Sequence, residues 1–111
     1  MNNLYVSKEA QNDLAEIKAY ITQELKNPDA AIATVSKITK KIRALKNQAY
    51  IGALLSSVAD TESNYRFLVS GNYLIFYRAY EKEVYIDRIL YARRDYMRIL
   101  FGDAQINETD E

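Results

Sequence analysis

The chain has 111 residues with 15 basic and 15 acidic side chains, a length that suits one globular domain, which we expect to span residues 1–102. Cysteine and histidine are both absent. Their absence excludes disulfides and thiolate catalysis and removes the usual transition-metal ligands, so we expect no metal and no cofactor.

The distribution of apolar and charged residues indicates where the protein acts and which part of it is charged. The N-terminus lacks the basic segment and apolar run of a signal peptide, and no stretch approaches the roughly 18 apolar residues of a membrane span, so we expect a cytoplasmic protein. Residues 103–111 hold four acidic side chains and no basic one, and we expect this acidic tail to be disordered. Residues 1–102 therefore carry 15 basic against 11 acidic groups.

The first half of the chain predicts a short strand and two helices. Leu4–Val6 forms the strand, and Ser7 is the N-cap of a helix from Lys8 to about Lys26. Asn27 caps a second helix that begins at Pro28. Each helix has one apolar stripe, which is Ala10, Leu14, Ile17, Ile21 and Leu25 in the first and Ala31, Val35, Ile38, Ile42 and Leu45 in the second. Because the link is so short, we expect the two helices to pack as an antiparallel hairpin.

The second half predicts a sheet followed by a short helix. The periodicity fails from Gln48 to Asn64, where we expect a packed loop. Tyr65–Ser70, Tyr73–Tyr80 and Val84–Tyr91 are rich in aromatic and β-branched residues and are separated by turns, which predicts an antiparallel meander. The segment ARRDYMRILF then predicts a helix. This order indicates an α+β fold in which the N-terminal strand and the helical hairpin pack on the antiparallel sheet.

The arginines of the second half give the first functional indication. Six of the seven arginines lie between residues 66 and 98, whereas seven of the eight lysines lie in the first 46 residues. Arginine suits bidentate contacts with phosphate and carboxylate groups. We therefore expect the arginines of the last third of the chain to converge on one exposed patch.

Four segments carry a resemblance to a known family. They are YVSKEAQNDLAEIKAYI, NPDAA, YRFLVSGNYLIFYRAY and VYIDRILYARRDYMRIL. In order and spacing, the chain resembles the RelE/ParE superfamily of toxins from bacterial type II toxin-antitoxin systems as far as about Gly102. The resemblance implies a toxin that arrests growth and that a cognate antitoxin holds inactive in a hetero-oligomer by wrapping over its sheet and helices.

Two activities occur in this superfamily, and the resemblance implies a different site for each. ParE-like members bind DNA gyrase and trap its cleaved complex, for which Arg93, Arg94 and Arg98 are the target-binding candidates. RelE-like members cleave messenger RNA on the ribosome without a metal, for which Arg66, Arg93 and Tyr96 are the catalytic candidates.

The ribonuclease pattern is incomplete in this sequence. Leu68 and Leu74 stand where ribonuclease members usually carry basic residues. The resemblance therefore favours the gyrase-binding activity. The alternatives are ribosome-dependent mRNA cleavage and a degenerate member that keeps only antitoxin binding.

Structural roles compete for many of the polar side chains. Arg78 and Arg88 lie in predicted strands, where a pair with an acid such as Asp87 is favoured over contact with a target. Arg93 and Arg94 can likewise pair with Asp87 or Asp95. Most of the ten tyrosines fit sheet faces and the core. In the simplest interpretation, the lysines of the second helix form a solvated helix face.

Overall fold

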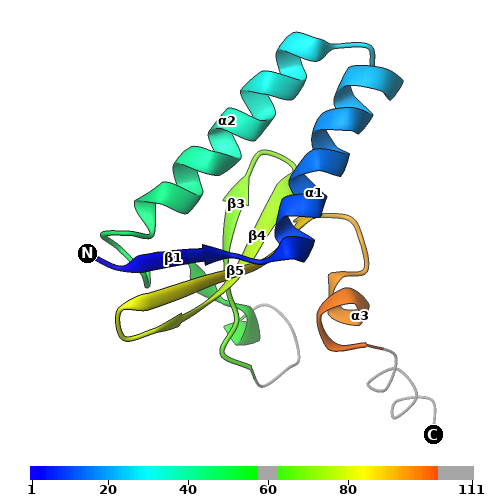
Figure 1. The fold of residues 1–111 in the computed structure, drawn as a ribbon. Coiled ribbons are helices and arrows are strands. Elements are labelled where there is room, and N and C mark those ends of the chain that lie inside the picture. Colours follow the sequence, from blue (N-terminus) through cyan, green and yellow to red (C-terminus); the bar gives the residue numbers. More distant parts are fainter. Residues whose placement is uncertain (58–62, 103–111) are drawn as a thin grey trace, which may run out of the picture.

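The protein folds as a five-stranded sheet with a helical hairpin on one face and a short helix on the other (Figure 1). The structure is a computed structural model that describes residues 1–57 and 63–102. The tail predicted at 103–111 and part of the loop predicted at 48–64 lie outside the described residues. The predicted α+β class is confirmed.

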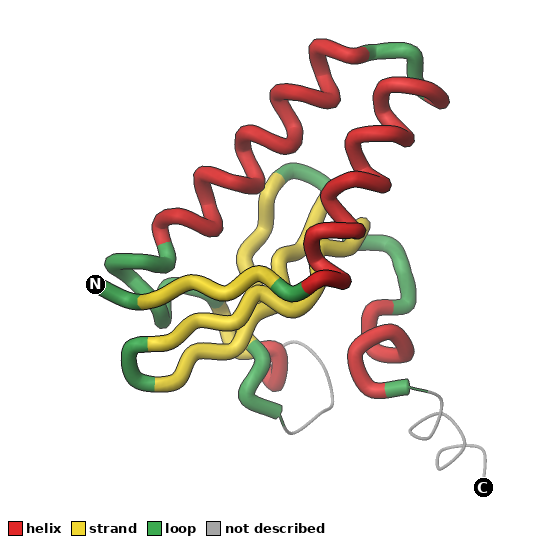
Figure 2. The backbone as a smooth tube through the Cα atoms, in the orientation of Figure 1, coloured by secondary structure: helices red, strands yellow, loops and turns green. Residues whose placement is uncertain are grey.

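Two capped helices, α1 (Lys8–Ala19) and α2 (Pro28–Ala44), form the antiparallel hairpin, and they run side by side in Figure 2. The Ser7 Oγ accepts a hydrogen bond from the backbone N–H of Ala10 at 2.9 Å. The Asn27 Oδ1 accepts one from the N–H of Ala30 at 3.1 Å. Each side chain satisfies a backbone donor that the first turn of a helix leaves open, so both predicted N-caps are confirmed.

The end of the first helix differs from the prediction. After Ala19 the chain winds as a π-helix, η1 (Tyr20–Glu24), in which the N–H of Leu25 donates to the carbonyl of Tyr20. A π turn holds one more residue than an α turn and therefore shifts the phase of the apolar stripe. Leu25, which the α-helical spacing placed in the buried stripe, is consequently 57% exposed.

The predicted meander is confirmed to within one residue at each strand end. Its strands are β3 (Arg66–Ser70), β4 (Tyr73–Tyr80) and β5 (Glu83–Tyr91), and the sheet order is β1-β5-β4-β3-β2. The N-terminal strand β1 (Asn3–Val6) pairs parallel with β5. The long connection between them, which includes the α1–α2 hairpin, β3 and β4, provides the crossover that parallel pairing requires.

The predicted 48–64 loop contains two short elements that the sequence pattern did not indicate. They are β2 (Ala53–Leu54), which pairs with β3, and a 3-10 turn, η2 (Leu55–Ser57). The last element of the described chain is α3 (Tyr96–Phe101). The sequence predicted this helix from residue 92, but residues 92–95 form a loop, because the Asp95 side chain caps the helix only at this point. The strand β2 could not be predicted, because two residues are too few to show an alternation of apolar and polar side chains.

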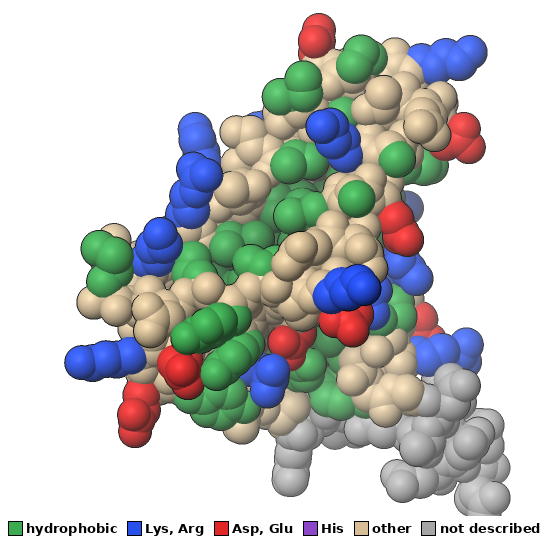
Figure 3. All heavy atoms as spheres, in the orientation of Figure 1, with side chains coloured by type: hydrophobic (Ala, Val, Ile, Leu, Met, Phe, Trp, Pro, Cys, Tyr) green, Lys and Arg blue, Asp and Glu red, His purple; other side chains and the backbone are tan. Residues whose placement is uncertain are grey.

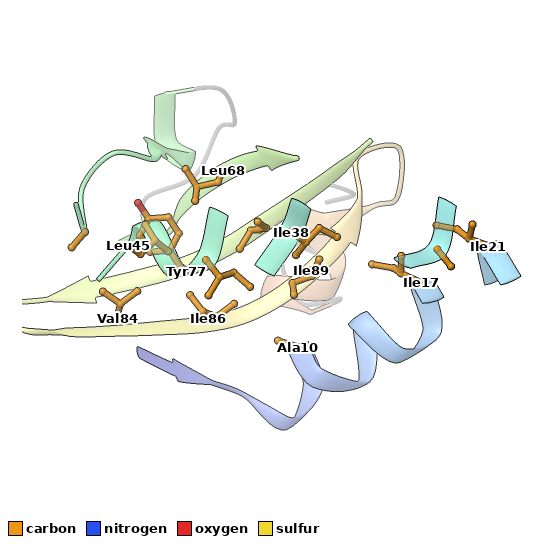
Figure 4. Packing of buried hydrophobic residues seen from close by; sticks show 14 residues of the cluster. Ala10, Ile17, Ile21, Ile38, Leu45, Leu68, Tyr77, Val84, Ile86 and Ile89 are labelled. Carbon is orange, nitrogen blue, oxygen red and sulfur yellow. The ribbon is translucent and has the colours of Figure 1, made fainter. Parts of the chain in front are cut away.

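Successive side chains of a strand point to opposite faces of the sheet, so the apolar side chains form two separate clusters, one on each face. The larger lies between the hairpin and the sheet, and Figure 4 labels Ala10, Ile17, Ile21, Ile38, Leu45, Leu68, Tyr77, Val84, Ile86 and Ile89 in it. The smaller lies on the opposite face, where Leu55, Phe76 and Leu90 are covered by side chains of α3. Successive residues of β4 therefore serve different cores.

A buried carboxylate ties α1 to β5. Asp13 lies outside the apolar stripe that the sequence predicts for the first helix, yet it is only 5% exposed. Its Oδ2 accepts hydrogen bonds from the Arg88 Nε at 2.8 Å and from the Ile89 backbone N–H at 2.9 Å, and its Oδ1 accepts from the Arg88 Nη2 at 2.9 Å. The carboxylate is buried with three donors around it, which is how a buried charge is stabilised.

Removing this carboxylate should destabilise the protein strongly. We expect Asp13→Ala to lower the free energy of unfolding by about 3 kcal/mol, because it leaves the Arg88 guanidinium without its partner and the Ile89 N–H without an acceptor. Urea denaturation followed by circular dichroism measures the change. Glu16→Ala removes an exposed carboxylate from the same helix and should shift the value by less than about 0.5 kcal/mol. Equal losses in the two variants would contradict the assignment.

Candidate functional site

The six arginines between residues 66 and 98 do not converge on one patch, and three of them are held inside the protein's own network. Arg88 pairs with Asp13 as described above. Arg78 pairs with Asp87 through its Nε at 2.6 Å and its Nη2 at 3.2 Å, and its guanidinium lies over the Tyr80 and Tyr85 rings. The structural interpretation of these two strand arginines, including Asp87 as a partner, is therefore confirmed.

Arg66 is held by the backbone that precedes β2. Its Nη1 donates to the carbonyl of Gly52 at 2.8 Å, and its guanidinium lies 5.0 Å from the centre of the Tyr50 ring. Gly52 has no room for a side chain, since a Cβ would lie 2.7 Å from the Phe67 carbonyl oxygen. Arg66 is the cross-strand partner of Tyr77, which belongs to the larger core, so Arg66 lies on the hairpin face of the sheet.

The catalytic candidates of the ribonuclease hypothesis are consequently separated. Tyr96 packs against Phe76 with 5.3 Å between ring centres, on the face of the sheet that α3 covers. Arg66 is on the opposite face. Arg93 follows the end of β5. The last residue of β5, Tyr91, pairs with Tyr73 at the start of β4, whereas Arg66 pairs with Tyr77 further along that strand. The structure does not bring Arg66 together with Arg93 and Tyr96.

Two further arginines, Arg93 and Arg94, lie in the loop between β5 and α3. The side chains of Arg93 and Arg94 are exposed and make no hydrogen bond or ion pair with other described residues. Neither pairs with Asp87 or Asp95, the structural alternative that the sequence left open for them. We call Ala92–Asp95 the arginine loop.

Arg98 is the third target-binding candidate, and it lies close to the arginine loop in the first turn of α3. Its Nε is 3.7 Å from the Asp95 Oδ2, and Asp95 also caps the helix by accepting from the Arg98 backbone N–H. Both side chains are exposed, so this ion pair contributes little to stability. The structure thus places Arg93, Arg94 and Arg98 within one short segment.

A cleft of about 510 Å³ opens beside the arginine loop and was not predicted from the sequence. Arg94 lines it together with Tyr20 and Glu16 from the first helix and Tyr73 and Tyr91 from the sheet. Burial, and secondarily the neighbouring Tyr20 and Tyr91 hydroxyls, raise the pKa of Tyr73. The cleft offers a cation, a carboxylate and aromatic rings, a combination that suits binding to a protein segment.

The residues of this site come from elements that are far apart in the sequence, which explains why spacing did not reveal the cleft. Tyr20 reaches it because the π-helix extends α1 past the sheet, and Tyr73 because the β3–β4 turn lies opposite.

Within residues 1–57 and 63–102, no three carboxylates gather to form a group that could hold a metal ion. In that same part of the chain, no helix is long and apolar enough to span a membrane.

Comparison with known proteins gives the family. The family model described as ParE toxin of type II toxin-antitoxin system, parDE, matches residues 4–96. A solved structure described as the chromosomal ParDE TA system from P. aeruginosa is 25% identical with a TM-score of 0.69, covering 84% of this chain and 98% of that one. YafQ from E. coli strain BL21(DE3) is 16% identical with a TM-score of 0.52, covering 92% and 100%, and is similar in fold. No curated protein sequence matches the chain.

The fold is thus that of a small toxin of the RelE/ParE superfamily. Since the match spans most of the sequence, the chain belongs to the ParE toxin family of type II toxin-antitoxin systems. The superfamily resemblance seen in the sequence is confirmed.

Unfolding measurements can test which arginines stabilise the fold and which do not. We expect the double variant Arg93→Ala, Arg94→Ala to change the free energy of unfolding by less than about 0.5 kcal/mol, because neither side chain has a partner in the described structure. Arg88→Ala should cost about 3 kcal/mol, since it leaves Asp13 buried without its cation. Thermal and urea unfolding compare the variants. A large loss in the double variant would show that the loop arginines are structural.

The Tyr65 hydroxyl provides a pH test of the network around Arg78. It donates to the Asp87 Oδ2 at 3.0 Å, and burial, followed by the negative charge of Asp87, raises the pKa of Tyr65 from 10.0 to about 12. The folded protein therefore keeps this proton at a pH where the unfolded chain has lost it. The resulting stabilisation is complete below pH 10 and is lost as the pH rises to about 12.

We accordingly expect Tyr65→Phe to make the decline in stability between pH 10 and pH 12 shallower. Urea unfolding at several pH values in this range measures the slope. Tyr50→Phe, which removes an exposed hydroxyl, should leave the slope unchanged. An unaltered slope in Tyr65→Phe would contradict the role given to its bond with Asp87.

Proposed function

We propose that this toxin arrests growth by binding DNA gyrase in the cytoplasm through the arginine loop, with Arg98 and the adjoining cleft as further contacts. The observation that carries the proposal is that Arg93 and Arg94 are exposed and have no side-chain partner in the described structure. Arginine and tyrosine supply much of the binding energy at protein interfaces. Similarity to the ParDE structure and the resemblance to gyrase-binding ParE-like members support this choice of target.

The separation of the ribonuclease candidates weighs against mRNA cleavage. Metal-free cleavage needs a proton acceptor, a proton donor and cations around one phosphate. Arg66 and Tyr96 lie on opposite faces of the sheet, and Leu68 is buried where a second cation would be needed. We therefore assign Arg93 to target binding and give no catalytic role to Arg66 or Tyr96.

An antitoxin is the second partner that we propose. The family description names a toxin-antitoxin system, and the similar P. aeruginosa structure is of a ParDE system. We further propose that residues 1–102 act as one toxin domain, because the hairpin and α3 both pack on the same sheet. An antitoxin that covers the arginine loop would block the proposed gyrase contact directly.

A gyrase supercoiling assay with the purified proteins tests the proposal. We expect the toxin to inhibit supercoiling and the double variant Arg93→Ala, Arg94→Ala to be weaker by about tenfold or more, because removing interface arginines costs on the order of 2 kcal/mol. Lys8→Ala with Lys18→Ala, which removes two exposed cations from α1, is the matched control and should inhibit as well as the unaltered chain.

Two outcomes would overturn this function. If supercoiling is unaffected and reporter mRNA is cleaved in a translation extract, the protein is a ribonuclease despite the separation of Arg66 from Tyr96. If neither assay responds and expression without an antitoxin fails to arrest growth, the chain is a degenerate member that keeps only antitoxin binding.

A further inference from the structure

The solvent side of α2 carries a row of cations that the proposed function does not use. Lys37, Lys40 and Arg43 follow one another at intervals of three residues and are exposed. The buried residues Ala31, Ile38, Ile42 and Leu45 face the sheet, so helical geometry places the three cations on the outer side of the helix. Figure 3 shows basic side chains along this side of the hairpin. We call Lys37, Lys40 and Arg43 the α2 stripe.

The positive charge of this surface is not neutralised within the described structure. Lys41 and Lys46 flank the α2 stripe, and the one acid of α2, Asp29, lies in its first turn. None of the stripe cations forms an ion pair with an acid of the described residues. Lys41 is fixed at the edge of this surface, because its Nζ donates to the Val69 carbonyl at 2.7 Å.

The helix dipole explains only part of this row. Cations are favoured within the last turn of a helix, where the unpaired carbonyl groups lie. Arg43 and Lys41 are in that turn of α2, but Lys37 and Lys40 precede it. The helix dipole therefore does not explain why Lys37 and Lys40 lack acidic neighbours.

The composition of the surface fits a polyanion better than a protein. Lysine is depleted at protein interfaces, which depend on buried aromatic or aliphatic anchors. The remaining outward positions near the α2 stripe hold small or polar residues, such as Ser36, Ala44 and Asn47. The exposed large apolar residue of α2, Ile32 at 62%, precedes the stripe by more than one turn. Phosphate binding requires cations and no such anchor.

We infer that the α2 stripe binds the phosphate backbone of duplex DNA without sequence selectivity. Its three cations span about 9 Å along the helix axis, a length over which duplex DNA presents on the order of five phosphate charges. The surface lies on the hairpin and is distinct from the arginine loop, which follows β5 at the sheet (Figure 1). This activity goes beyond gyrase binding and does not depend on it.

Fluorescence anisotropy with a labelled duplex of about 20 base pairs tests the inference on the full-length purified toxin. We expect weak binding at about 50 mM salt, with the logarithm of affinity falling against the logarithm of salt with a slope of about −3 to −4. Changing the three stripe residues together, Lys37→Gln, Lys40→Gln and Arg43→Gln, should weaken binding by about tenfold or more. It should also reduce the slope by about one per cation removed.

The matched control removes three exposed lysines from elsewhere, by Lys8→Gln, Lys18→Gln and Lys82→Gln. It has the same net charge as the stripe variant, and we expect it to retain most of the affinity. Circular dichroism checks that both variants remain folded. Absence of binding at low salt, or an equal loss in both variants, would overturn the inference. The anisotropy experiment contains no gyrase, so neither result affects the supercoiling test of the proposed function.

Discussion

The Asp13 carboxylate is the interaction on which the arrangement of the molecule depends. It lies at the junction of α1 and β5, just beyond the point where β1 stops pairing, and it accepts one backbone and two guanidinium hydrogen bonds. A buried charge is tolerated only with such partners, so this contact fixes both the rotation of α1 and its position along β5. The position of α1 then sets the width of the cleft, because Glu16 and Tyr20 line it from the same helical segment.

Charge pairing divides the arginines into two groups with different roles. Arg78 and Arg88 are matched by acids on neighbouring elements, and Arg66 is matched by carbonyl groups. The charges of Arg78 and Arg88 are compensated by these acids, so these two residues add little to the field around the protein. The exposed cations of the arginine loop and of α2 are not compensated by described acids, and they generate the positive potential that an anionic partner meets first.

Much of the fold could be predicted because local patterns and final structure agree. Ser7 and Asn27 marked the helix starts, and the aromatic and β-branched residues between two turns predicted β4 from Tyr73 to Tyr80 without error. The failures occurred where long-range contacts override local pattern. Nothing near Asp13 in the sequence shows that an arginine 75 positions later will draw its carboxylate into the core. Parallel pairing of β1 with β5 is likewise a choice between distant partners.

The candidate site was predictable in part for the same reason. Arg93 and Arg94 are adjacent in sequence and remain together in space. Arg66 was grouped with them by sequence similarity, but strand register places it at the other end of β3. The cleft depends on a π-helix that spacing did not indicate.

The pairing of β1 with β5 also constrains when the molecule can mature during its synthesis. The N-terminal strand finds its partner in residues 83–86, so the sheet cannot close until nearly all of the described chain has left the ribosome. Contacts between such distant segments form late, because a long loop must close first. The hairpin can form early, but β1 has no strand to join until β5 is made, and the arginine loop follows directly after it. The toxin thus gains its native surface only after β5 has been synthesised.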